Sequence, residues 1–149
     1  MSALANHAGA LAGLGRASAA APVRDRATSI VSRTVAAFLS AESRDSVVEA
    51  GAWNNLCWFG SLVGAASEAL SACERGVAVS DDSIAIRDSR GLARAMTGDF
   101  SGAIDDFNAY VNRDPEHRHA NTRRTWIAEL EAGRNPFTEA MIMQLLLER

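Results

Sequence analysis

Apolar and small residues recur at helical spacing over most of this chain. The first stripe begins near Asp25 and consists of Ala27, Ile30, Val31, Thr34, Phe38 and Ala41. Residues spaced by three and four positions share one face of a helix, so the stripe predicts an amphipathic helix. Residues 1–22 are mostly Ala, Gly, Ser and Leu. This composition predicts a flexible arm or linker, with a short amphipathic helix as the alternative.

Cap and turn residues divide the rest of the chain into further predicted helices. Ser46 to Glu49 has the pattern of a capping box, and Asp99 is placed to cap another helix. Pro115 and Pro136 each follow a cap residue and suit the first turn of a helix. These signals predict helices over residues 46–63, 66–79, 83–97, 100–112, 114–133 and 137–148. With no Asn-Gly or Asp-Gly hairpin turn, the chain is predicted to be all-α.

The last predicted helix is polar only at Glu139, Gln144 and Glu148. Its broad apolar side contains Phe137, Met141, Ile142, Leu145 and Leu146. An apolar helix face of this width must be buried against other residues. The helix therefore either seals the end of the domain or meets a second copy of the chain.

Signature residues recur at an interval of 34 positions. The matching pairs are Gly64 and Gly98, Ala69 and Ala103, and Cys73 and Phe107. Trp53 and Leu56 supply a W-x2-L opening, and Pro115 follows the A-x3-F segment of the second copy. In this pattern the chain resembles the tetratricopeptide repeat family over roughly residues 50–133.

The resemblance implies a short α-solenoid of helix–turn–helix repeats that serves as a protein interaction scaffold. The repeats would occupy about 50–83 and 84–117, with a partial third repeat and a capping helix over 118–149. The helix near residue 25 would cap the other end, so that 23–149 forms one helical domain after the 1–22 arm.

The resemblance also implies a concave groove lined by the first helix of each repeat. Its expected ligand-binding residues are Asn54, Trp58, Leu62, Asp88, Leu92, Met96, Thr122, Trp126 and Leu130. The apolar residues would anchor a peptide or partner segment, and Asn54, Asp88 and Thr122 would hold its backbone. In the alternative, the N-terminal arm or the C-terminal helix fills the groove and both tryptophans belong to the core.

Arginines replace two aromatic positions of the second repeat, and Gly60 replaces one in the first. Arg87, Arg90 and Arg94 share a helix face, where they would hold a phosphate or a carboxylate. We favour the alternative that they pair with acids of the neighbouring helix, such as Asp105 and Asp106.

Two cysteines lie 16 residues apart, on facing sides of one helix pair in the repeat register. We expect Cys57 and Cys73 to be buried free thiols, with a disulfide as the alternative. No apolar run is long enough to span a membrane, and the first residues lack a basic leading segment. We therefore expect a cytoplasmic protein without membrane contact.

The composition excludes several chemistries. All fifteen basic residues are arginine, so a Schiff-base lysine, a P-loop lysine and a lysine-dependent clamp for chaperone tails are ruled out. We find no nucleophile with a base and no Gly-rich phosphate loop, and expect neither an enzyme nor a cofactor. The basic cluster of His117, Arg118, His119, Arg123 and Arg124 contains acids, which favours a solvated face over an RNA or metal site.

The segments WNNLCWFGSLVG, RDSRGLARAMTGDF and AGRNPFTEA are similar to the C-terminal repeat tails of large multidomain bacterial signalling proteins. That similarity implies an adaptor that works beside a protease, a kinase or another signalling protein. A structural subunit that assembles through its terminal helices is the main alternative, and an RNA-binding module is the weaker one.

Overall fold

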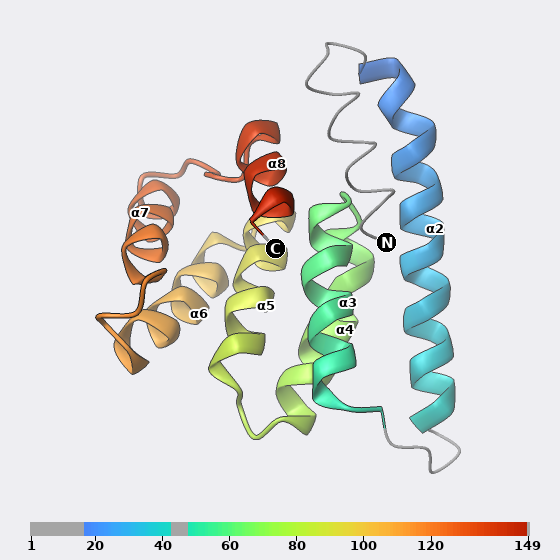
Figure 1. The fold of residues 1–149 in the computed structure, drawn as a ribbon, viewed down its shortest axis with the longest axis horizontal. Coiled ribbons are helices and arrows are strands. Elements are labelled where there is room, and N and C mark those ends of the chain that lie inside the picture. Colours follow the sequence, from blue (N-terminus) through green and yellow to red (C-terminus); the bar gives the residue numbers. More distant parts are fainter. Residues whose placement is uncertain (1–16, 43–47, 149) are drawn as a thin grey trace.

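The computed structural model describes residues 17–42 and 48–148, and this part of the chain contains helices and no strand (Figure 1). The all-α prediction is therefore confirmed for the described residues. The seven helices there are α2 (Ala17–Glu42), α3 (Ala50–Leu62), α4 (Ala66–Val79), α5 (Ile84–Thr97), α6 (Phe100–Arg113), α7 (Ala120–Glu131) and α8 (Glu139–Leu147).

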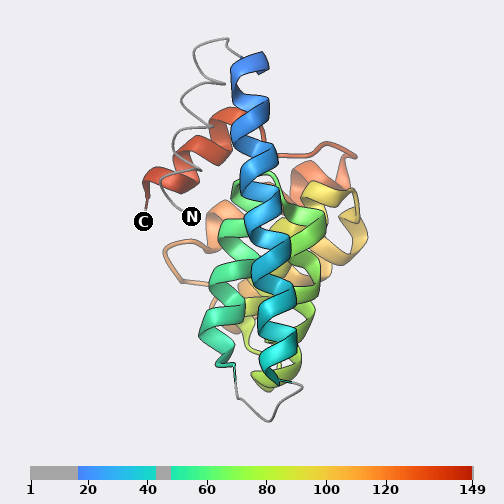
Figure 2. The same cartoon turned by 90° about the vertical axis from the view of Figure 1, so that its right-hand side faces the viewer.

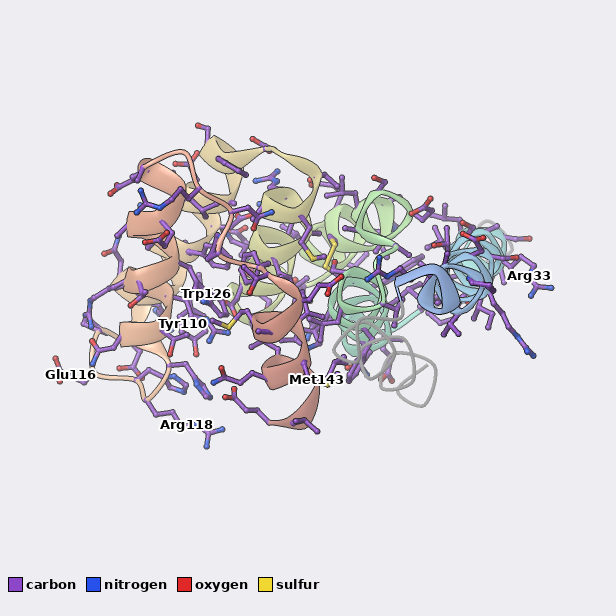
Figure 3. All side chains as sticks on the ribbon, turned by 90° about the horizontal axis from the view of Figure 1, so that it is seen from above. Arg33, Tyr110, Glu116, Arg118, Trp126 and Met143 are labelled. Atoms are coloured by element: carbon purple, nitrogen blue, oxygen red, sulfur yellow. A yellow bond between two sulfur atoms is a disulfide. The ribbon has the colours of Figure 1, made fainter. Side chains whose placement is uncertain are left out.

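The helices from α3 to α7 each pack against the next one along the chain, and α3 also contacts α5. The helix α2 packs alongside α3 and α4; it forms one edge of the molecule in Figure 1 and lies in front of the other two in Figure 2. Near the C-terminus of the chain, α8 runs back towards α3. It lies between α7 and α3 in the view from above (Figure 3). The chain thus returns over helices that precede it by almost 90 residues.

Small residues set the distance between paired helices. A Cβ atom added to Gly91 of α5 would lie 2.8 Å from the ring of Phe107 on α6, so only glycine fits there. Gly60 of α3 packs equally closely against Ala69 of α4, and also against Val31 of α2. Gly60 thus leaves room for both α4 and α2.

The ends of the central helices follow the sequence prediction to within one residue, at 66–79, 84–97 and 100–113. The carboxylate of Asp99 accepts a hydrogen bond of 2.9 Å from the backbone of Gly102, as a cap residue should. Gly98 ends α5 in the left-handed conformation, with φ of 91°. A glycine adopts this conformation without a steric penalty.

The predicted starts of α2 and α3 are wrong. The helix α3 begins at Ala50, and Glu49 precedes it without a side-chain cap bond. Ser46, the first residue of the predicted capping box, lies outside the described residues. The helix α2 begins at Ala17 instead of residue 25, because an alanine-rich stretch with high helix propensity extends it upstream. Residues 1–16 of the predicted arm are also outside the described part.

The predicted starts of α7 and α8 are wrong as well. Asp114 has an extended backbone before Pro115, which keeps the helix from starting there, and α7 begins only at Ala120. The helix α8 starts at Glu139, with Thr138 as its cap. In the segment before α8, the Asn135 side chain donates to the carbonyl of Ala95 at 3.1 Å. Its amide oxygen accepts from the backbone amide of Phe137 at 3.0 Å.

Aromatic side chains make two sets of contacts between helices in the core. Phe107, Trp126 and Phe137 form one cluster, with ring centroids 4.8 to 6.2 Å apart. Phe38 of α2 meets Trp53 of α3 edge-on at 5.2 Å. These contacts tie the segment before α8 to α6 and α7, and tie α2 to α3.

The expectation of free thiols is wrong, because Cys57 and Cys73 form a disulfide between α3 and α4 (Figure 3). Their Cα atoms are 4.8 Å apart, within the range that a disulfide can bridge. The register placed the two residues on facing sides of one helix pair, and the close approach of these helices brings the sulfur atoms into bonding distance.

A candidate binding pocket

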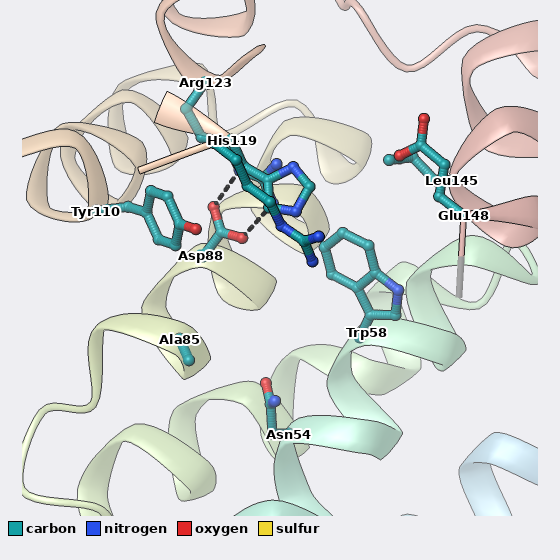
Figure 4. Close-up of a pocket in the computed structure, with 10 residues that line it drawn as sticks. Asn54, Trp58, Ala85, Asp88, Tyr110, His119, Arg123, Leu145 and Glu148 are labelled. Atoms are coloured by element: carbon teal, nitrogen blue, oxygen red, sulfur yellow. Dashed lines mark hydrogen bonds and ion pairs between the residues drawn. The ribbon is translucent and has the colours of Figure 1, made fainter. Parts of the chain in front are cut away.

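A pocket of about 310 Å³ lies where α3, α5, α6, α7 and α8 come together (Figure 4). Asn54 and Trp58 line it from α3, and Ala85 and Asp88 from α5. The opposite wall consists of Tyr110, Arg118, His119 and Arg123, and the lining is completed by Leu145 of α8 and by Glu148 directly after that helix. The pocket therefore combines aromatic and aliphatic side chains with charged groups of both signs.

Three of the nine expected groove residues line this pocket, namely Asn54, Trp58 and Asp88. The structure does not bring the other six to it. Thr122 is exposed elsewhere on α7, and Met96 is half-buried against the core. The remaining four are buried in the core: Leu62, Leu92, Trp126 and Leu130.

The C-terminal segment explains this burial. Phe137 packs on Trp126 with ring centroids 4.8 Å apart, and Leu145 and Leu146 of α8 are buried among the core residues. The part of the expected groove next to α7 is thus filled by the chain itself. The part next to α3 stays open as the pocket.

A buried ion pair forms one wall. The guanidinium of Arg123 donates to both carboxylate oxygens of Asp88, and each side chain is only 8% exposed. The same guanidinium lies over the ring of Trp126 at 4.5 Å and over that of Tyr110 at 5.1 Å. Asp88, which we expected to hold a peptide backbone, is therefore neutralised by Arg123.

The sequence predicts that Arg123 belongs to a solvated basic face, and it does not predict the ion pair that Arg123 forms in the pocket. Asp88 and Arg123 are 35 residues apart, one more than the repeat interval. Opposite charges at about this separation, on α5 and α7, are the signal that would have found the pair.

His119 lines the pocket, and its ring lies beside that of His117, which is outside the lining. The Tyr110 hydroxyl is hydrogen-bonded to Nδ1 of His117 at 2.8 Å, and the backbone amide of His119 donates to the same nitrogen. The ring centroids of His117 and His119 are 5.4 Å apart, and residues 115–119 are not helical. Burial, with help from Arg123, lowers the pKa of His119.

The amide oxygen of Asn54 has no hydrogen-bond partner among the residues that the structure describes. This Oδ1 atom is buried. A buried acceptor without a donor costs free energy, and native proteins rarely leave one so. A ligand with an N–H group would satisfy it.

A second polar cluster is satisfied internally and lies outside the pocket. Arg87, Arg90 and Arg94 all donate to the fully buried carboxylate of Asp106, at 2.8 to 3.0 Å. Glu74 accepts from Arg90 at 2.9 Å and from Arg94 at 3.1 Å. The hydrogen bond to Asp106 raises the pKa of Arg90 above its ordinary value. The favoured interpretation of these arginines as ion-pair partners is thus correct for Asp106.

Asp105 takes part differently. Its backbone carbonyl accepts from Arg87, while its exposed carboxylate makes no ion pair within the described part of the chain. The arginine face therefore offers no open site for a phosphate or a carboxylate from outside.

Comparison with protein-family models, with curated proteins and with solved structures finds no match to this chain. None of the helices that the structure describes is both long and apolar enough to cross a membrane.

Proposed function

We propose that this chain is a tetratricopeptide-like interaction scaffold that binds a peptide or partner segment in the pocket beside α3. The consecutive packing of α3 to α7 and the left-handed glycines 34 residues apart support the repeat architecture. The observation that carries the binding proposal is the buried, unpaired amide oxygen of Asn54. It needs a donor, and a backbone N–H of a bound segment supplies one.

The experiment is capture of partners from a native lysate on wild type, Asn54→Ala and Thr122→Ala. Both substitutions shorten a polar side chain on a helix, but only the first lies in the pocket. We expect one partner to be lost with Asn54→Ala and kept with Thr122→Ala. If both variants keep every partner, the pocket is not the binding site.

Stability separates this function from a structural role. The Oδ1 atom of Asn54 accepts no hydrogen bond from the described residues, so alanine there removes an unsatisfied acceptor and raises helix propensity. We expect Asn54→Ala to be up to about 1 kcal/mol more stable than wild type. A variant that folds better and binds worse identifies a residue kept for binding.

A structural subunit is the second candidate, favoured by exposed apolar residues on the terminal helices. Leu147 of α8 is 72% exposed and Leu39 of α2 is 43% exposed. A constant oligomeric mass over a wide concentration range in light scattering supports this candidate, provided that Leu147→Glu disrupts the oligomer. If light scattering gives the mass of a monomer at all concentrations, self-assembly is excluded.

The disulfide bears on where the protein works. Disulfides persist in oxidising compartments and are rare in the cytosol. The bond between Cys57 and Cys73 therefore weighs against the cytoplasmic expectation.

A further inference from the structure

The ring of His117 stands behind one wall of the pocket and is hydrogen-bonded to two residues of that wall. Its Nδ1 atom lies 2.8 Å from the Tyr110 hydroxyl, and the backbone amide of His119 donates to the same nitrogen at 3.3 Å. Tyr110 and His119 line the pocket (Figure 4), whereas His117 lies outside the lining. Tyr110 belongs to α6, and His119 directly precedes α7. One ring thus joins two parts of the wall that come from different elements.

These two contacts fix the protonation state of the ring. A backbone N–H group can only donate, so Nδ1 of His117 accepts the bond from His119 and carries no proton. The Tyr110 hydroxyl therefore donates to that nitrogen as well. In this structure the His117 ring is neutral, with its proton on Nε2.

Protonation of His117 would remove an acceptor that one of the two donors cannot replace. An imidazolium ring has a proton on both nitrogens, so Nδ1 becomes a donor. The Tyr110 hydroxyl can rotate and accept from it, and that contact persists with its roles reversed. The backbone amide of His119 cannot accept, so it loses its hydrogen bond. Proton uptake at one ring therefore acts on the backbone of the pocket wall.

The turn before α7 concentrates this effect at the pocket. The carbonyl of His119 is held by the backbone amide of Arg123, at 3.1 Å, in the first turn of α7. The amide of His119 is held from the other side by the His117 ring. Residues 115–119 are not helical, so no helix ladder stabilises the backbone there. Protonation thus frees the peptide unit between Arg118 and His119, and both of these residues line the pocket.

Charged side chains from each neighbouring element act on this wall, namely Asp88 of α5, Asp114 after α6, Arg118 in the turn, Arg123 of α7 and Glu148 after α8. Asp88 and Arg123 neutralise each other, which leaves Arg118 against two acids. This balance permits proton uptake by an imidazole, the side chain that titrates between about pH 5 and 8. Burial and then the charges of Arg123, Arg118 and His117 lower the pKa of His119, so the two rings oppose each other's protonation.

From these contacts we propose that His117 is a pH-sensitive switch of the pocket. The unprotonated ring holds the amide of His119 and keeps the wall in its binding shape. The protonated ring releases that amide, and the bound segment dissociates. The inference rests on the proposed function and adds the regulation of the same site.

The first test needs no partner and uses nuclear magnetic resonance of the isotope-labelled full chain. Long-range nitrogen–proton spectra at neutral pH should show Nδ1 of His117 without a proton, and a proton on that nitrogen overturns the proposal. Between about pH 7.5 and 5.5, above the range in which most carboxylates titrate, the amide signal of His119 should move to that of an amide without an intramolecular acceptor. The amide signal of Asn54, on the wall formed by α3, should stay in place.

Two matched substitutions separate the neighbouring rings. His119→Gln leaves His117 as the titrating ring at this wall and should keep the pH response of the amide at position 119. His117→Gln should abolish that response, because glutamine stays neutral and its amide oxygen accepts a hydrogen bond throughout. A response that follows the His119 ring, or no response in wild type, overturns the proposal. If His117→Gln does not fold, the ring nitrogen of wild type and the response of His119→Gln decide.

The second test asks whether the switch controls binding. The partner captured from native lysate is washed at about pH 7.5 and then at about pH 5.5 on wild type and on His117→Gln. Loss of one hydrogen bond corresponds to roughly fivefold in affinity, so acid should release the partner from wild type and retain it on His117→Gln. Equal release from both proteins overturns the regulation and leaves the pocket as the binding site. If no partner depends on Asn54, the proposed function fails, and the resonance experiment alone decides whether His117 is a switch.

Discussion

Replacing Asp106 by alanine removes the one buried acceptor on which three arginines converge. Its carboxylate is fully buried, and it receives four hydrogen bonds of 2.8 to 3.0 Å from Arg87, Arg90 and Arg94. Removing one partner of a buried ion pair costs about 3–5 kcal/mol. The arginines keep 12 to 22% exposure and Glu74 still pairs with two of them, so we expect the lower end, about 3 kcal/mol.

The assay is urea and thermal unfolding followed by circular dichroism. For a chain of this size, 1 kcal/mol shifts Tm by roughly 2–4 °C, so Asp106→Ala should melt roughly 6–12 °C below wild type. The control is Asp105→Ala, one position away on the same helix, whose exposed carboxylate makes no ion pair with the described residues. It should stay within about 0.5 kcal/mol of wild type. Two variants of equal stability would refute the central role of the buried carboxylate.

Three further predictions concern the helix packing and the rim. Cys57→Ser/Cys73→Ser should lose about 3 kcal/mol in urea unfolding, because the disulfide closes a loop of 16 residues; an unchanged midpoint would contradict the bond. Gly91→Ala should cost about 1–3 kcal/mol, since its Cβ would clash at 2.8 Å, whereas Gly51→Ala has open space and should gain roughly 0.5–1 kcal/mol. His119 has a lower pKa in the folded protein than in the unfolded chain. Its contribution to the free energy of unfolding is therefore present above the unfolded-state pKa, near 6.5, and is lost as the pH falls below that pKa. Tm should therefore drop less between pH 7.5 and 5 in His119→Gln than in wild type.

The sequence predicted the helices well where local signals decide. Asp99 and Gly98 fix the turn between α5 and α6 with their own backbone preferences, and both act there as the pattern predicts. Where a tertiary contact decides, the prediction failed. Phe137 looks like part of an amphipathic helix, but it is drawn into the aromatic cluster and α8 starts after it.

The candidate site was predicted in part for the same reason. The resemblance to the repeat family implied that Asn54, Trp58 and Asp88 face one groove, and the structure brings them to one pocket. Register could not show that Arg123 would neutralise Asp88 across two helices, or that α8 would fold back over the groove. Both depend on contacts between residues distant in sequence, which periodicity within one helix does not reveal.

The affinity of a captured partner for wild type, Asn54→Ala and Thr122→Ala, measured by isothermal calorimetry, tests the central claim most directly. If an N–H group of the partner pairs with the buried amide oxygen of Asn54, Asn54→Ala should weaken binding by about 1–2 kcal/mol, roughly 5- to 30-fold. The affinity of the control Thr122→Ala should stay within about twofold of wild type. Equal affinities of wild type and Asn54→Ala would contradict the claim that this pocket binds the partner.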